Sequence, residues 1–246
     1  MLRLERLRDD WTILRQMLRG MPRSASHAAD LQAFYAPQAD GYDRFRARLL
    51  HGRAELIESL PLPRDATVVE LGGGTGANAE FFGARLESIA RLDIVDLCPA
   101  LLAQARARLA GYRNVEVVSA DAATYRPSRP VDCVYFSYSL SMMRDWRAAL
   151  ANALTMLKPH GVLGVVDFYH SGPRPSAGLR RHGPLARAFW RHWFAHDGVR
   201  LDPAHLGALR AWLPEHTLRE HAAAVPYVPL LRVPYYIFVG RKPLRD

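Results

Sequence analysis

The chain has 246 residues, of which 49% are apolar and 23% charged, so it can bury the core of one ordinary domain. Its formal net charge is +9, and only Lys158 and Lys242 of its 33 basic residues are lysines. A positive balance suggests an anionic partner: nucleic acid, an anionic membrane surface or an acidic substrate. Arginine-rich codon usage would explain the shortage of lysine without any partner.

Several classes of protein are excluded at this level. No stretch approaches the roughly 18 uncharged apolar residues of a transmembrane helix, and the first ten residues mix acids and bases where a secretory signal needs an apolar run. Cys98 and Cys133 are the only cysteines and form no CxxC pair, which argues against a disulfide scaffold or a thiolate zinc site. We therefore expect a cytoplasmic protein.

Residues 1–62 are predicted to form an N-terminal helical cap. Within residues 1–21, apolar side chains recur with a 3-4 spacing and arginines flank the stripe they form. Such a helix can lie in a membrane interface or pack on the core, and the pattern leaves both open. A second helical stretch, residues 31–60, is interrupted near Pro37 and Gly41.

Residues 63–246 alternate between short apolar strands and helices. Strands are predicted at residues 67–71, 91–95, 115–118, 131–136 and 161–168, and helices at about 76–87, from Pro99 onward and at 145–157. This alternation predicts a doubly wound, mostly parallel α/β sheet covered on both faces. A helical insertion at about 170–215, with helices at 184–196 and 203–213, then precedes an antiparallel C-terminal hairpin formed by residues 217–224 and 234–239.

The most informative segment is Val68-Val-Glu70-Leu-Gly72-Gly-Gly74-Thr-Gly76, where a strand runs into a glycine turn. Glycines permit positive φ angles and let a ligand approach the backbone. The segment fits the G-x-G-x-x-G/A pattern of dinucleotide-binding proteins. It also fits E/D-x-G-x-G-x-G, and in this it resembles the class I S-adenosylmethionine-dependent methyltransferases.

Three strand-end acids favour the second pattern. Glu70 ends the first strand, where its carboxylate would repel a pyrophosphate. Asp96 ends the second strand and can accept both ribose hydroxyls of a nucleoside, although it can also cap the following helix. Asp121 ends the third strand, at the position that contacts the adenine in this family, or serves only as a turn residue. One departure from the family is His160, which stands where a second glycine is usual before Gly161.

The resemblance implies a Rossmann-like fold with S-adenosyl-L-methionine as cofactor and S-adenosyl-L-homocysteine as product. The residues that it assigns to cofactor binding are Glu70, Gly72, Gly74, Gly76, Asp96, Leu97, Asp121, Ala122, Ser137 and Tyr42.

A narrower resemblance spans about residues 30–243. It is carried by the stretches Phe34–Arg46, Phe136–Met143, Val166–Ser171 and Val225–Arg241, which look like those of the bacterial diacylglycerylhomoserine N-methyltransferases of betaine-lipid synthesis. It implies three methyl transfers to the amine of a homoserine-headed lipid, on an anionic membrane surface at the inner face of the membrane. The enzyme that supplies this lipid is then a candidate partner.

Other functions stay open at this stage. Phosphatidylethanolamine or a quinone precursor could be the acceptor, and the chain could instead be a non-catalytic, cofactor-binding partner subunit. The Asn/Asp-Pro-Pro-Tyr motif of nucleic-acid amino-methyltransferases is replaced by Phe136-Ser-Tyr138, so we expect no nucleic acid as partner. His192 and His196 lie one helical turn apart, but Trp193 stands where a zinc-binding HExxH motif needs Glu, so we expect no metal.

Methyl transfer to an amine depends mainly on alignment, and the amine must be neutral when it attacks. The candidate catalytic residues are Tyr138, Asp167, His170 and Tyr42, the last because the resemblance implies that it closes over the cofactor. The candidate substrate-binding residues are Tyr35 and Tyr169, whose rings suit methylated cations, and Arg46 and Arg53, which suit carboxylates. If the positive charge serves this function, arginines should gather around the site entrance.

Overall fold

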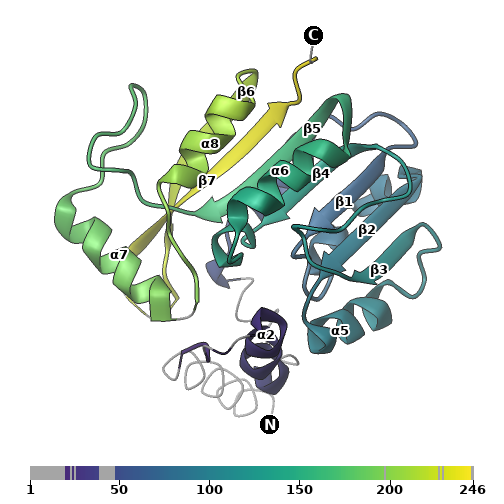
Figure 1. Ribbon diagram of the computed structural model, residues 1–246, viewed down its shortest axis with the longest axis horizontal. Coiled ribbons are helices and arrows are strands. Elements are labelled where there is room, and N and C mark those ends of the chain that lie inside the picture. The colour runs from purple at the N-terminus through teal and green to yellow at the C-terminus, as the bar shows by residue number, and fades with distance from the viewer. Residues whose placement is uncertain are drawn as a thin grey trace.

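The structure is a computed structural model that describes residues 20–22, 24, 26–38, 48–196, 198–226, 228 and 230–244. These residues contain a seven-stranded sheet in the order β3-β2-β1-β4-β5-β7-β6 (Figure 1). Its strands are β1 (Thr67–Leu71), β2 (Arg91–Asp96), β3 (Val115–Ser119), β4 (Val131–Ser137), β5 (Leu157–Phe168), β6 (His216–Ala224) and β7 (Arg232–Arg241). Strands β1 to β5 pair in parallel, and β7 pairs antiparallel with both β5 and β6. The predicted fold is therefore confirmed.

Helices cover both faces of the sheet because successive side chains of each strand point to opposite faces. On one face, α4 (Arg53–Ser59), η2 (Ala77–Ser88) and α5 (Pro99–Leu109) pack against Val68 and Tyr135. On the other face, α6 (Trp146–Met156) and α8 (Ala204–Trp212) pack against Val69 and Phe136. The remaining helices are α2 (His27–Tyr35), η1 (Ala36–Gln38), η3 (Leu140–Met142) and α7 (Pro184–His196).

Three predicted elements differ from the structure. The helix expected at residues 76–87 is a 3-10 helix, interrupted at Gly83, whose φ of 53° and ψ of −135° are not helical. Strand β5 begins at Leu157 rather than at Gly161, because its first residue pairs with Val131 before a shift of register. The helical stretch expected to begin at residue 31 begins at His27, in α2, and residues 39–47 of that stretch lie outside the described residues.

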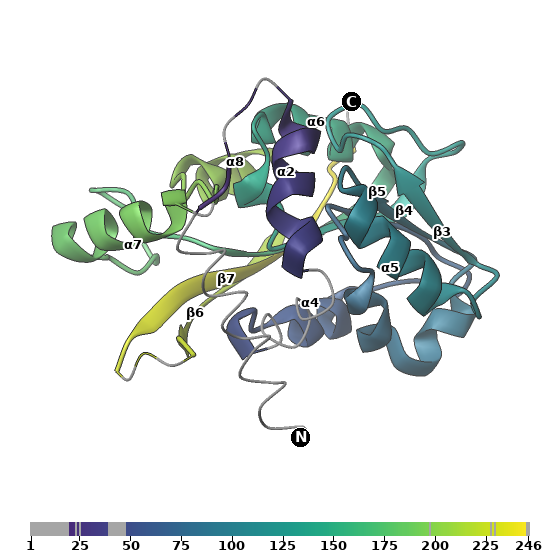
Figure 2. The ribbon, with the colours of Figure 1, turned by 90° about the horizontal axis from the view of Figure 1, so that it is seen from below.

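The N-terminal region is only partly described. The amphipathic stretch expected at residues 1–21, like Tyr42 and Arg46, lies outside the described residues apart from residues 20 and 21. Helix α4, which the sequence assigns to the cap, buries Leu56 and Ile57 in the same core as the sheet. Figure 2 shows α2 in front of the sheet, close to α5. None of the described helices is both long and apolar enough to cross a membrane.

Candidate functional site

A pocket opens at the carboxyl ends of β1, β2 and β4, beneath α2. This is the point at which the chain switches from one half of the sheet to the other, where doubly wound folds bind ligands. Its wall consists of the glycine turn, the residues that follow β2, β3 and β4, and the side of α2. The residues that line it include His27, Tyr35, Arg53, Gly72, Gly74, Asn78, Asp96, Leu97, Asp121, Ala122, Ser137, Tyr138, Met142 and Arg144.

The glycine turn has backbone angles and close contacts that favour glycine over residues with a side chain. Gly72, Gly74 and Gly76 have φ angles of 75°, 55° and 68°, in the left-handed region that favours glycine. A Cβ atom at Gly72 would lie 2.4 Å from the Cβ of Ser139. The amides of Gly72 and Gly73 both donate to the carbonyl of Val95, which ties the turn to the end of β2. The turn therefore presents backbone to the pocket, as a close-fitting ligand requires.

Asp96 holds both the start of α5 and the glycine turn. One carboxylate oxygen accepts from the amide of Cys98 at 2.8 Å, next to the start of α5, and the other accepts from the amide of Gly74 at 2.9 Å. Desolvation raises the pKa of Asp96, and these backbone donors oppose the rise. A carboxylate oxygen can accept more than one hydrogen bond, so Asp96 can hold the turn and still accept from hydroxyls in the pocket.

Glu70 lies behind the pocket rather than in its wall. Its carboxylate is completely buried and accepts from the Asn78 amide at 2.6 Å and from the Tyr135 hydroxyl at 2.9 Å. Burial raises the pKa of Glu70 to about 7. Asn78 lines the pocket and accepts from the Arg53 guanidinium at 3.2 Å, so Glu70 acts on the pocket through Asn78. The sequence signal for Asn78 is its position directly after the glycine turn.

Four more of the residues predicted to bind the cofactor reach the pocket, whereas Gly76 of the glycine turn is not among its lining residues. Leu97, Asp121, Ala122 and Ser137 all line it. The Asp121 carboxylate accepts from the amide of Ala123 at 2.8 Å, so it also stabilises the turn that follows β3. The buried Ser137 hydroxyl has no hydrogen-bond partner among the described residues, and a bound ligand could satisfy it.

Tyr138, Tyr35 and Arg53 also line the pocket, each held by other groups. Tyr138 has a φ of 54°, rare for a bulky side chain, and its hydroxyl donates to the His51 carbonyl at 2.6 Å. Burial raises the pKa of Tyr138 well above its ordinary value, so the phenol stays neutral. The Tyr35 hydroxyl lies 3.1 Å from the sulfur of Met142. These rings therefore act as fixed walls rather than as proton acceptors.

Three predicted residues are not brought to the pocket. Asp167 is completely buried at the end of β5 and accepts from the amide and hydroxyl of Ser141, at 2.9 and 2.7 Å. Burial raises its pKa to about 6. His170 is buried, with Nδ1 3.1 Å from the Ser171 carbonyl oxygen. Tyr169 donates to Glu220 of β6 and packs edge-on against Tyr236 of β7. The hairpin covers this end of β5, so Asp167 supports the η3 loop instead of meeting a substrate.

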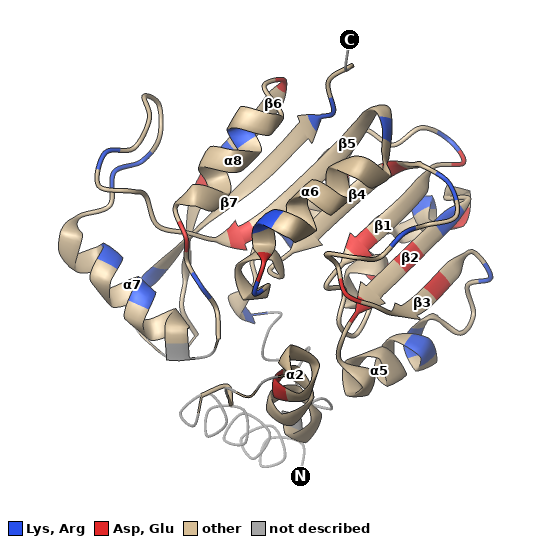
Figure 3. Ribbon diagram, viewed as in Figure 1, with Lys and Arg blue, Asp and Glu red and all other residues tan. Residues whose placement is uncertain are grey.

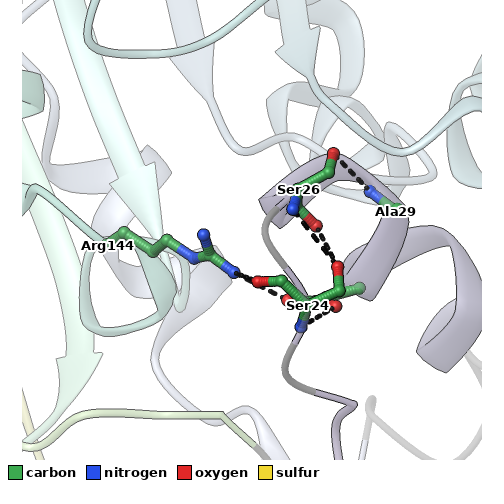
Figure 4. A network of polar contacts seen from close by, with 5 residues as sticks. Ser24, Ser26, Ala29 and Arg144 are labelled. Atoms are coloured by element: carbon green, nitrogen blue, oxygen red, sulfur yellow. Dashed lines mark hydrogen bonds and ion pairs between the residues drawn. The ribbon is translucent and has the colours of Figure 1, made fainter.

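A polar network fastens α2 over the pocket (Figure 4). The Arg144 guanidinium donates to the Asp30 carboxylate at 2.7 Å and to the Ser24 carbonyl at 2.9 Å. The Asp30 carboxylate also accepts from the Ser24 amide at 2.8 Å. Asp30 and Arg144 are far apart in the chain, which is why the sequence alone does not identify this pair. His27, at the start of α2, lines the pocket, and desolvation lowers its pKa.

The basic residues are more widely spread than predicted. Figure 3 shows Lys and Arg on α5, α6, α7 and α8, and not only around α2. Arg53 and Arg144 line the pocket, and the other Lys and Arg residues of the described part of the chain do not. Within the described part of the chain, no group of three or more His, Cys, Asp or Glu side chains is placed to hold a metal ion.

Comparisons with known proteins agree with this geometry. Residues 68–161 match the family described as a methyltransferase domain. Trans-aconitate 2-methyltransferase of Methylobacterium radiotolerans is 34% identical over 124 residues, which are 50% of this chain and 46% of that protein. The chain thus spans about half the length of the curated relatives it matches.

Solved structures share the fold. Phosphoethanolamine N-methyltransferase 2 of Haemonchus contortus superimposes with a TM-score of 0.68 at 13% identity, over 91% of this chain and 61% of that one. The YcgJ protein of Bacillus subtilis superimposes with a TM-score of 0.65 at 15% identity, over 79% of this chain and 99% of that one. At such identities the likeness concerns the fold alone.

Proposed function

We propose that this chain, whose residues 68–161 match a methyltransferase domain, transfers methyl groups from S-adenosylmethionine to an acceptor bound beneath α2. One observation carries the proposal: the glycine turn and Asp96 form one wall of a pocket that α2 covers. When bound, S-adenosylmethionine supplies a methyl group activated by its sulfonium.

The residues of the pocket fit this cofactor. The turn around Gly72 and Gly74 lines the pocket with backbone that carries no side chain. Asp96 offers carboxylate oxygens to ribose hydroxyls, and Asp121 offers one at the adenine end. Ser137 offers a buried hydroxyl without a partner among the described residues. Methyl transfer then depends on how these groups align the acceptor with the cofactor.

We propose the amine of diacylglycerylhomoserine as the acceptor, methylated three times. The stretches around Phe136–Met143 and Val166–Ser171 support it by resemblance. The guanidinium groups of Arg53 and Arg144 lie in the pocket wall, where they suit the carboxylate of the headgroup. The rings of Tyr35 and Tyr138 suit the cation that results. His27, which its lowered pKa keeps neutral, replaces Asp167 and His170 as the proposed proton acceptor.

A second acceptor class is a carboxylate of a small polyacid. The 34% identity to trans-aconitate 2-methyltransferase favours it, and the same arginines would bind the remaining carboxylates. Both classes contain a carboxylate, and they differ in the atom that receives the methyl group. A lipid acceptor would in addition place the protein in the cytoplasm, at the inner face of the membrane and near the enzyme that supplies the lipid.

Labelled S-adenosylmethionine tests the acceptor. The protein is incubated with diacylglycerylhomoserine dispersed in detergent, phosphatidylethanolamine, trans-aconitate and a quinone precursor, and the products are separated. We expect label on the homoserine amine, in mono-, di- and trimethylated forms. Label on trans-aconitate alone would replace the lipid with the polyacid, and cofactor binding without any labelled product would indicate a non-catalytic subunit.

A matched pair of variants tests the site. Asp96→Asn keeps the size of the side chain, but the new NH2 group faces one of the two backbone amides, of Gly74 and Cys98, that donate to the carboxylate. We expect cofactor affinity to fall roughly tenfold or more, as for a lost charged hydrogen bond. Asp65→Asn changes an exposed aspartate outside the pocket and should bind as the wild type. Equal affinity of both variants would overturn the assignment of the pocket.

A further inference from the structure

Helix α7 exposes an apolar stripe at one end of the molecule. Both ribbon views show it standing away from the sheet (Figures 1 and 2). Its Trp190 and Phe194 are buried in the core, whereas Leu185, Phe189 and Trp193 are 85%, 42% and 42% exposed. The exposed three lie four residues apart, so they share one face of the helix. We call this face the α7 stripe.

The segment that contains the α7 stripe has basic but no acidic residues. Residues 170–196 contain five arginines and neither Asp nor Glu. These arginines are Arg174, Arg180, Arg181, Arg187 and Arg191, and two of them lie on α7 itself (Figure 3). A helix with Leu, Phe and Trp on one face and arginines on the opposite face has the composition of helices that lie in a membrane interface.

A row of aromatic rings connects α7 to the pocket. Tyr138, in the pocket wall, lies 4.5 Å from Phe168 between ring centroids, and Phe168 lies 4.6 Å from Phe194 of α7. Phe194 in turn lies 5.7 Å from Trp190, which lies 4.9 Å from Phe189 of the stripe. The amide of Arg200, shortly after α7, donates to the Ser141 carbonyl beside the pocket. The helix that exposes the stripe is therefore packed against Phe168, which in turn contacts the pocket wall.

We infer that α7 docks this protein on an anionic lipid bilayer. The α7 stripe enters the interfacial layer, and the arginines of residues 170–196 attract the protein to the negatively charged surface. This inference rests on the proposed lipid acceptor, because docking through α7 brings the pocket wall to the layer in which lipid headgroups lie. The charge favours a membrane over a protein as occupant, since a bilayer with anionic lipid supplies negative charge around the whole stripe.

Sedimentation with lipid vesicles tests the stripe. Wild type should bind phosphatidylcholine vesicles that contain phosphatidylglycerol and bind those without it more weakly. Phe189→Ser with Trp193→Ser should reduce the partition coefficient roughly tenfold or more, because two half-exposed aromatic side chains lose their apolar contact. Tyr112→Ser with Trp212→Ser removes side chains that are 39% and 38% exposed on other elements, and should bind as the wild type.

The arginines are tested separately. Arg187→Gln with Arg191→Gln should weaken binding to the vesicles with phosphatidylglycerol by roughly fivefold per arginine and leave binding to pure phosphatidylcholine nearly unchanged. Cofactor affinity, measured on every variant, confirms that the fold is intact. Wild-type binding by the Phe189 and Trp193 variant would overturn the inference. So would a dimer in solution that is lost in that variant, because the stripe would then be a contact between protein copies.

The two proposals fail in different ways. Vesicle binding through α7 without methylation of diacylglycerylhomoserine refutes the lipid acceptor and leaves the docking surface standing. Methylation of the detergent-dispersed lipid, combined with equal vesicle binding by the wild type and the Phe189 and Trp193 variant, refutes the docking surface and leaves the acceptor standing.

Discussion

The ends of β2 and β5 carry the same signal in sequence, an acidic residue at the end of a parallel strand, yet only one of them reaches the pocket. Asp96 is held by two backbone amides and lines the pocket. Asp167 pairs with Tyr236 of β7 across the ladder and is completely buried. A strand-end acid is therefore a site residue only where the neighbouring strand and the following loop leave the sheet edge open.

Substitution in the glycine turn should have the largest effect. Gly72→Ala places a Cβ atom 2.4 Å from Ser139 and forces alanine to a φ of 75°. We expect the free energy of unfolding to fall by roughly 2–5 kcal/mol, with loss of cofactor binding. Chemical denaturation and a cofactor-binding titration measure both.

A matched control lies in the insertion that follows β5. Gly178 has a φ of 83°, but a Cβ atom there would meet nothing within 4 Å. Gly178→Ala should therefore cost only about 1 kcal/mol and leave cofactor binding unchanged. Equal losses in the two variants would show that backbone strain, and not the close approach to Ser139, dominates at Gly72.

Glu70 should make the free energy of unfolding depend on pH. Its pKa is raised from 4.5 to about 7 in the folded chain, so the folded state holds a proton that the unfolded state has lost. The free energy of unfolding therefore falls as pH rises from about 4.5 to about 7, by on the order of 3 kcal/mol.

Glu70→Gln removes this titration. Denaturation at about pH 5 and about pH 8 should show a smaller loss of stability in the variant than in the wild type. Asp167, whose pKa is also raised, contributes a loss of the same sign in both proteins and cancels in the comparison. An identical loss in the two proteins would mean that Glu70 does not titrate in this range.

Asp167→Asn tests the role of the β5 end. The amide has an oxygen at only one of the two carboxylate positions, so it cannot accept from the backbone amides of both Ser141 and Phe168, and the variant should lose about 1–3 kcal/mol of stability. Because Ser141 lies next to Met142 of the pocket, KM should rise more than kcat falls. Ser141→Ala should reproduce a smaller part of this change. A variant of unchanged stability whose kcat collapses would instead restore a catalytic role for Asp167.

The smallest effect is expected at the turn before the buried part of β5. His160 has a φ of 61°, in the left-handed region that favours glycine. His160→Gly should stabilise the chain by roughly 0.5 kcal/mol, because relief of the left-handed strain slightly exceeds the larger entropy that glycine loses on folding. A lower denaturation midpoint in the variant would contradict this balance.

Local patterns predicted most of the fold. The period of apolar residues placed α7 at residues 184–196 and α8 within one residue of its ends. The 3-10 character of η2 was missed, because Gly83 breaks the helix at a position where apolar residues keep the helical period. The apolar run predicts a start of β5 at Gly161, four residues too late, because the first residue, Leu157, belongs to the strand through its pairing with β4.

The sequence by itself determined the glycine turn and the acids at the ends of β1, β2 and β3, because each is marked by the apolar strand next to it along the chain. Tertiary structure alone decided that Glu70 turns behind the pocket toward Asn78, and that Asp30 and Arg144 fasten α2 above it. It also divided the aromatic residues of α7 between core and surface. These outcomes depend on which elements pack together, and contacts between distant segments leave no periodic signal in the chain.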